Sequence, residues 1–223
     1  VKTGKVVRGY LGVGIQSVTP ALAESFKLKD NKGALVAEVV HNGPADKAGL
    51  KEGDVITALN GQPIIDANNL TMSVSTVAPG TKVTLDVLRD GRKQQIAAQT
   101  GERPNSRSNR AKDAMSSNDQ DEGVLNGVAV NDLDADARTQ LNLPARLKGA
   151  VITDVEPDSA AAKAGLRAGD VILELNKQPV ASAAEAVELS AKADGKKTLL
   201  RLWSRGTTIF VVVDESGTNK SNS

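Results

Sequence analysis

The sequence predicts two copies of a small, mostly β domain with short helices (α+β), each folded as a partly open β-barrel or sandwich. The first observation is an internal repeat, in which residues 47–63 return as residues 163–179 with 12 of 17 positions identical. The second is a series of short apolar runs separated by Asn-Gly and Asp-Gly turns, which are typical of antiparallel strands. The third is length, because 223 residues suit two domains of about 100 residues each.

The first half of the first copy contains two predicted strands and two short helices. Alternating apolar side chains predict a strand over residues 12–18. A Thr-Pro pair then starts a helix over 19–26, because threonine caps a helix and proline suits its first turn. An apolar run predicts a buried strand over 34–40. A helix of one to two turns over 44–49 starts at a proline and ends at a glycine.

The second half of this copy adds three strands and a longer helix. The strands are predicted over 54–59, 81–89 and 92–99, and an Asp-Gly turn joins the last two. Between the first two of these strands, a helix begins near Asp66 and carries apolar residues along one face. Val, Leu, Ile and Ala must build the core, because only four residues of the chain are aromatic.

The tight turn after residue 59 differs between the copies. It is Asn60-Gly61 in the first copy and Asn176-Lys177 in the second. Hairpin turns of this length need positive φ, which lysine disfavours. We therefore expect the asparagine alone to adopt the left-handed conformation in the second copy.

The repeat and the composition together predict four regions of the chain. We expect a first domain over 1–100 and a second domain over 123–214. Residues 101–122 are rich in Ser, Asn, Arg and Asp and nearly free of large apolar side chains, which predicts a flexible polar linker. Residues 215–223 are predicted to form a disordered tail.

The composition argues against several classes of partner. The 28 basic residues nearly balance the 27 acidic ones, so bulk charge favours no nucleic-acid partner, and four aromatic residues are too few for base stacking. The absence of cysteine excludes disulfides, thiolate catalysis and cysteine-ligated metals. The longest apolar runs fall short of the roughly 20 residues that span a bilayer. We expect a soluble chain with no membrane insertion.

No catalytic site is expected in this chain. His41 is the only histidine and lies in the HNGP segment before a short helix, and no GxSxG or GNSGG-like nucleophile turn is present. One histidine without cysteine or an HExxH motif does not predict a metal site. We therefore expect no metal, no cofactor and no catalysis by this chain alone.

The glycine-rich stretch RGYLGVG, residues 8–14, allows three interpretations. It can cradle a phosphate, permit a tight bend with no further role, or present backbone N–H groups to another anion. A nucleotide-binding turn would lead from a strand into the N-terminus of a longer helix. Here the glycines lead directly into a strand, which disfavours the nucleotide.

The repeated pattern AGLxxGDVIxxLNxxP, preceded by RGYLGV in the first copy, resembles the PDZ domain of bacterial HtrA (Do-like) proteases. The tandem is similar to the C-terminal part of a Do-type periplasmic serine endoprotease, in which a trypsin-like domain precedes the first PDZ domain. Residues 1–7 resemble the segment that joins the two. In AGLKEGDVI itself we expect a structural role, with Asp54 bonding nearby amides and the apolar residues packing inward.

The resemblance implies a peptide groove in the first domain. The amides of Leu11, Gly12 and Val13 would receive the C-terminal carboxylate of a peptide that pairs as an extra strand along residues 12–16. Arg8 would hold the carboxylate directly or through water; the alternative is a solvated strand residue. An uncharged pocket implies an apolar terminal residue, with Met72 or Val77 as further lining. The implied peptide-binding residues are Arg8, Tyr10, Leu11, Gly12, Val13, Gly14, Ile15, Leu70 and Val74.

The second copy departs from this pattern. Asn126 replaces Leu11, Ala129 replaces Gly14, and no arginine stands at the position of Arg8. Its pocket helix offers mainly alanine, Val187 and Leu189. The weaker peptide-binding residues expected here are Leu125, Asn126, Gly127, Val128, Ala129 and Val130. We therefore expect the first domain to be the principal binder.

Three functions remain open. The first is recruitment of C-termini or extended segments of misfolded envelope proteins to the protease domain of the same parent chain, in the periplasm. The second is a stand-alone scaffold that links partner proteins without proteolysis. The third is the PDZ tandem of an intramembrane metalloprotease, which the long polar linker disfavours. The resemblance further implies contacts between PDZ domains that help to build oligomers.

Overall fold

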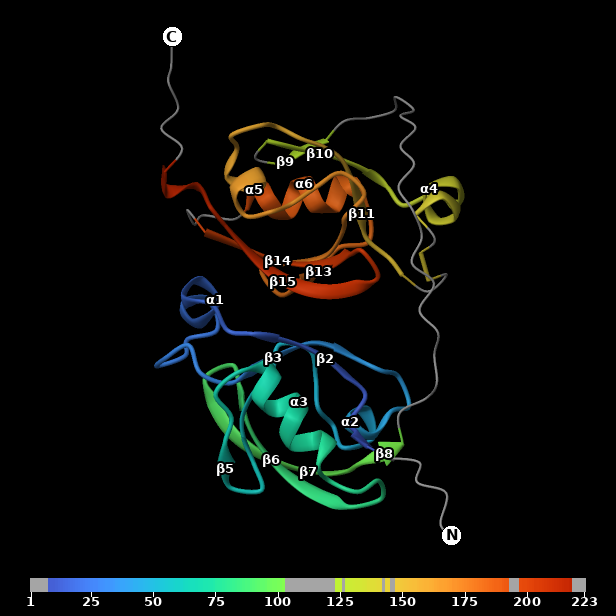
Figure 1. The fold of residues 1–223 in the computed structure, drawn as a ribbon. Coiled ribbons are helices and arrows are strands. Elements are labelled where there is room, and N and C mark those ends of the chain that lie inside the picture. Colours follow the sequence, from blue (N-terminus) through green and yellow to red (C-terminus); the bar gives the residue numbers. More distant parts are fainter. Residues whose placement is uncertain are drawn as a thin grey trace. The chain divides into compact units, whose positions relative to one another are not determined.

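The computed structural model describes residues 8–102, 123–125, 127–141, 143–144, 147–192 and 197–217. The chain divides into two compact units, Val1–Ser108 and Asn109–Ser223, which we describe separately (Figure 1). Most of the segment predicted as a linker lies outside the described residues, as do the predicted joining segment 1–7 and residues 218–223 of the predicted tail. The domain boundaries stay a prediction.

The first unit contains a six-stranded antiparallel sheet, a separate pair of short strands and three short helices. Its sheet has the order β2-β3-β4-β6-β7, with β5 beside β4, and β1 pairs separately with β8. The strands are β1 (Gly9–Tyr10), β2 (Val13–Ser17), β3 (Ala34–Val39), β4 (Val55–Leu59), β5 (Gln62–Pro63), β6 (Lys82–Arg89), β7 (Arg92–Gln99) and β8 (Gly101–Glu102). The helices are α1 (Pro20–Ser25), α2 (Pro44–Lys47) and α3 (Ala67–Ser75).

The helix starts that the sequence predicts in the first unit are capped as expected. The side chain of Thr19 accepts a hydrogen bond from the N–H of Leu22 and caps α1, and Asp66 caps α3 by accepting from Asn69. Both caps satisfy amides that the first turn of a helix leaves free. One prediction differs at the start of the linker, because Gly101 and Glu102 form β8 instead of coil.

The second unit repeats this architecture, except that its first strand, β9, joins the main sheet, whereas β1 of the first unit does not. Its sheet has the order β15-β14-β12-β11-β10-β9, with β13 beside β12. The strands are β9 (Gly123–Leu125), β10 (Val128–Asp132), β11 (Ala150–Val155), β12 (Val171–Leu175), β13 (Gln178–Pro179), β14 (Lys197–Ser204) and β15 (Thr207–Asp214). The helices are α4 (Ala135–Gln140), α5 (Ala160–Lys163), α6 (Ala183–Ala191) and a 3-10 turn over Glu215–Gly217, which begins the predicted tail.

The hairpin turn of the second unit corrects one expectation. Asn176 has a φ of 48°, and Lys177 also takes a positive φ of 66°. A two-residue hairpin of this type needs positive φ at both central positions, so the flanking strands impose the left-handed conformation on the lysine as well.

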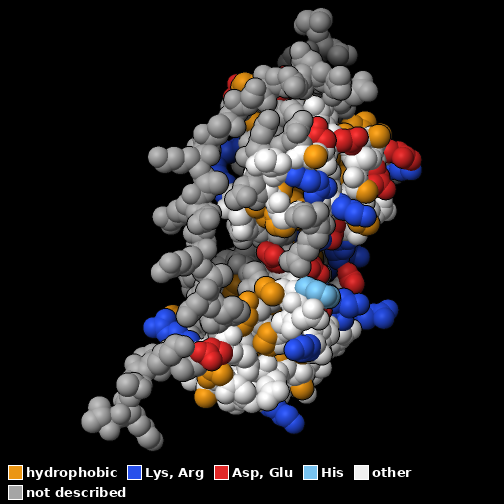
Figure 2. Space-filling view, turned by 90° about the vertical axis from the view of Figure 1, so that its right-hand side faces the viewer, with side chains coloured by type: hydrophobic (Ala, Val, Ile, Leu, Met, Phe, Trp, Pro, Cys, Tyr) orange, Lys and Arg blue, Asp and Glu red, His pale blue; other side chains and the backbone are white. Residues whose placement is uncertain are grey.

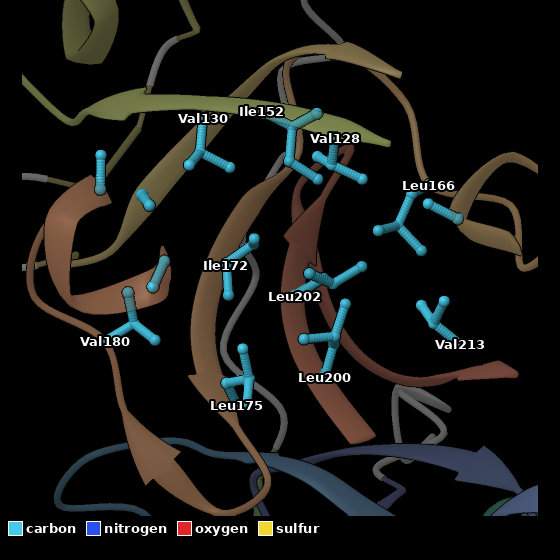
Figure 3. Packing of buried hydrophobic residues seen from close by; sticks show 14 of the residues in the cluster. Val128, Val130, Ile152, Leu166, Ile172, Leu175, Val180, Leu200, Leu202 and Val213 are labelled. Atoms are coloured by element: carbon cyan, nitrogen blue, oxygen red, sulfur yellow. The ribbon is translucent and has the colours of Figure 1, made fainter. Parts of the chain in front are cut away.

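Each unit has its own aliphatic core between the sheet and its helices. In the first unit the core includes Val36, Ile56, Leu70 and Leu85, all nearly inaccessible to solvent. Figure 3 shows the core of the second unit, where the labelled side chains Ile172, Leu200 and Leu202 extend from neighbouring strands into the same interior. The chain is mostly β with short helices, as predicted.

Candidate functional site

The glycine-rich loop of the first unit runs from β1 into β2. Gly9 and Tyr10 pair with Glu102 and Gly101 of β8, so the loop is held at its start by the end of the same unit. Leu11 is buried in the core, and Gly12 has a φ of 75°, a left-handed conformation that favours glycine. The chain therefore turns sharply here and enters β2 at Val13.

Two amides of this loop have no acceptor among the residues that the structure describes. The carbonyls of Leu11 and Gly12 accept hydrogen bonds from Ala45 and Val40, each at 2.8 Å. The N–H groups of Leu11 and Gly12, by contrast, donate to no residue in the described part of the chain. Buried N–H groups are nearly always bonded. A pair of adjacent free donors in a buried loop suits an anion.

The strand that follows has an open edge. β2 pairs with β3 on one side, and no described strand pairs with its other side. The carbonyl of Gly12 accepts from Val40, the residue just after β3, and Gly14 stands opposite Glu38. Because bonding alternates along an antiparallel strand, the intervening Val13 turns its N–H and C=O to the open edge. An added strand can pair there directly beyond the free amides.

Helix α3 borders this edge and supplies apolar side chains. Leu70 and Val74 are buried in the core, and Val13 and Ile15 pack against the same cluster from β2 while keeping part of their surface exposed. The predicted residues of strand and helix thus come together. Met72 does not join them: it is 70% exposed, and its position is just over half a turn from Leu70 on the helix.

Arg8 and Val77 complete the predicted set. Arg8 is exposed and forms no ion pair with the described residues, so its role toward a carboxylate stays a prediction. Val77, just beyond the C-terminus of α3, is partly buried against the core.

Gly9 is a residue of this site that the sequence analysis did not identify. A Cβ atom at Gly9 would lie 2.5 Å from the carbonyl oxygen of Val77 and 2.6 Å from that of Val74. Real Cβ atoms do not approach backbone oxygens this closely, so only glycine lets β1 cross the end of α3. The repeat contains the signal, because the aligned residue in the second copy is Val124.

In the second unit the corresponding edge is occupied. β9 pairs with β10 in the register Leu125 with Val128, Ala129 with Val124 and Val130 with Gly123. It lies on the side of β10 away from β11, next to α6. Figure 1 shows β9 beside β10 over this helix. The chain itself thus fills the place where the first unit leaves β2 open.

The remaining predicted residues of the second unit can be compared with their counterparts in the first unit. Asn126 lies outside the described residues. The carbonyl of Gly127 accepts from Glu156 at 2.8 Å, as that of Gly12 does from Val40. On α6, Ala186 stands where the first unit has Leu70 and Ser190 where it has Val74, so smaller side chains border β9.

The repeated GDVI motif has a structural role, as predicted. The carboxylate of Asp54 is buried and accepts a hydrogen bond from the N–H of Lys51 at 2.9 Å. Arg89 adds an ion pair that the sequence analysis did not foresee. Hydrogen bonding to Asp54, partly opposed by burial, raises the pKa of Arg89 further above its already high ordinary value.

The single histidine lies at the surface. Nδ1 of His41 is 3.3 Å from Oδ2 of Asp46, and the imidazole is 71% exposed. The face of the molecule in Figure 2 shows this imidazole in pale blue, with basic and acidic side chains on both units. The described residues contain no group of three His, Cys, Asp or Glu that could hold a metal ion. None of the described helices is long and apolar enough to cross a membrane.

Two family models match the chain. Both are described as PDZ domains, and they cover residues 9–100 and 151–204. Neither is a protease domain.

The chain is also similar to curated bacterial proteins. It is 40% identical over 219 residues to the "Probable periplasmic serine endoprotease DegP-like" of Brucella suis. The matched region covers 96% of this chain and 40% of that protein. Its identity to the DegP-like protein of Pseudomonas putida (strain GB-1) is 40% over 211 residues, covering 94% and 43%. The chain thus spans about two fifths of the length of these relatives.

Solved structures of HtrA-type proteins match somewhat less than half of the chain. The HtrA-type protease AlgW with decapeptide has a TM-score of 0.44 at 40% identity, covering 47% of this chain and 32% of that one. The HtrA3 PDZ domain bound to a phage-derived ligand has a TM-score of 0.38 at 26% identity, covering 43% and 88%.

Proposed function

Because this chain belongs to the PDZ family and carries two such domains, we propose that its first domain binds the C-termini of extended polypeptides between β2 and α3. The observation that carries the proposal is the pair of free amides at Leu11 and Gly12, placed at the start of an open strand edge. A terminal carboxylate satisfies such donors, and the preceding residues add a strand to β2. This mode combines one anion site with main-chain pairing.

The last side chain of the ligand would lie over Val13, Ile15 and the buried face of α3. All these side chains are apolar, so the terminal residue should be apolar too. Burying one such side chain is worth about 1.5–3 kcal/mol, and each net hydrogen bond adds about 0.5–1.5 kcal/mol. After the cost of association, binding in the micromolar range is expected.

The second domain is the weaker binder in this proposal. Its strand edge already carries β9, so a peptide must first displace residues 123–125. The exchange replaces existing main-chain bonds with new ones and therefore contributes less net free energy.

The similarity to DegP-like endoproteases supports a proposal for the function of the parent protein. The tandem would recruit C-termini or extended segments of misfolded envelope proteins and regulate a serine protease domain of the same parent chain in the periplasm. This chain would contribute recognition and no catalytic group. Contacts between PDZ domains would help to assemble oligomers.

Titration calorimetry tests the binding mode. A peptide with an apolar last residue and a free carboxylate should bind at about micromolar Kd, and its C-terminal amide should bind at least about tenfold more weakly, because hydrogen bonds to a charged group are the stronger ones. Equal affinity for the two forms would exclude the carboxylate loop.

A further inference from the structure

The side chain of Glu38 lies against Gly14 of the edge strand β2. The two residues are direct partners in the β2–β3 register. A Cβ atom at Gly14 would lie 3.1 Å from the Cβ of Glu38 and 3.7 Å from its Oε2. The carboxylate therefore lies over the place where any other residue would project a side chain. It forms no hydrogen bond or ion pair with the described residues.

A peptide strand on this edge would bring one particular side chain to Glu38. With its carboxylate on the amides of Leu11 and Gly12, the last residue pairs at Val13 and the residue before it stands opposite Gly14. Side chains of paired residues share one face of a sheet, and neighbouring strands are about 4.8 Å apart. The penultimate side chain thus projects beside Gly14 on the face that holds the Glu38 carboxylate.

Because residue 14 is glycine and has no side chain, the penultimate side chain of the peptide can contact the Glu38 carboxylate. Across two strand spacings, about 9.6 Å, a short side chain does not reach Glu38, whereas the long stem of lysine or arginine does. A larger residue at position 14 would fill this path. The second copy keeps an acidic residue, Asp154, at the same register but opposite Ala129.

From this arrangement we propose that the first domain selects peptides with lysine or arginine immediately before an apolar C-terminal residue, and that Glu38 determines this selectivity. The inference rests on the proposed C-terminal binding mode and specifies its ligand. An acidic residue at the same position is disfavoured, because two carboxylates would face each other across Gly14.

The test uses the whole chain and three peptides that differ only in the penultimate residue: lysine, alanine or glutamate. At low ionic strength, calorimetry should give a Kd for the lysine peptide about two- to fivefold below that of the alanine peptide, the range of a partly exposed ion pair. The glutamate peptide should bind more weakly than the alanine peptide. High salt should reduce both differences.

Two variants assign the effect to this carboxylate. Glu38→Gln should make the three affinities converge, and Glu38→Lys should reverse their order. Asp154→Asn is the matched control in the second domain and should leave the wild-type order unchanged. Equal affinities for the wild type, or a lysine preference that persists in Glu38→Gln, would overturn the assignment while leaving C-terminal binding intact. Failure of all three peptides to bind would overturn the binding mode itself and this inference with it.

Discussion

Arg89 holds the buried carboxylate of Asp54 with both ends of its guanidinium fork. Nε donates to Oδ1 and Nη2 donates to Oδ2, each at 2.7 Å, and Nη2 also donates to the carbonyl of Gly49 at 2.9 Å. The side chain of Asp54 is almost wholly buried, and that of Arg89 is mostly so. The pair links the last turn before β4 to the end of β6, which are far apart in sequence.

Replacing Asp54 with alanine should destabilise the first domain by about 3–5 kcal/mol, because it leaves a mostly buried guanidinium unpaired. Urea unfolding of the whole chain measures this as an earlier transition of that domain. Asp170→Ala is the matched control: Asp170 caps the same turn by accepting from Arg167 at 3.0 Å, but no guanidinium of the described residues pairs with it. An equal loss for both variants would contradict the assigned role of Arg89.

The same pair should be insensitive to alkaline pH. The folded-state pKa of Arg89 is raised, so its stabilising contribution is fully present below the unfolded-state pKa and is lost only as the pH rises through the folded one. Both values lie above the range in which proteins are usually studied. The difference in unfolding free energy between wild type and Asp54→Ala should therefore stay constant from pH 7 to about pH 10.

Replacing Val13 with proline should remove most peptide binding. Proline lacks the N–H that Val13 turns to the open edge, where the carboxylate of the ligand is expected. The Kd should rise at least about tenfold, measured by calorimetry with a circular dichroism spectrum to check folding. The matched change in the second domain, Val128→Pro, should have a much smaller effect. A larger effect at Val128 would reverse the ranking of the two domains.

Loosening β9 should open the second groove. Leu125→Pro restricts the backbone of the strand and removes an N–H opposite Val128, so pairing with β10 should weaken. In the Val13→Pro background, the added change should restore measurable binding of the same peptide, though more weakly than in the wild type because α6 offers smaller side chains. If binding is not regained, occupation by β9 is not what limits the second domain.

Much of the fold was predictable from local patterns. Thr19 and Asp66 cap helices where the sequence placed them, because a side-chain oxygen next to a free amide acts within one turn. The hairpin turns were equally local, apart from Lys177, whose positive φ is imposed by strands on both sides. The candidate groove was predictable only as a set of residues, because the distance between β2 and α3 depends on packing.

The sequence by itself determined that the chain contains two copies of one domain, which helices and longer strands the first copy has, and where the glycine-rich loops lie, since repeats, caps and alternation act over short stretches. Only the tertiary structure decided that the copies are unequal at the strand edge. Gly9 lets β1 pass against the carbonyls of Val74 and Val77 and pair with β8, and β2 keeps one edge open. The matching residue of the second copy is Val124, and there β9 pairs with β10 instead. The physical reason is a close contact between segments distant in sequence, and no local pattern encodes such a distance.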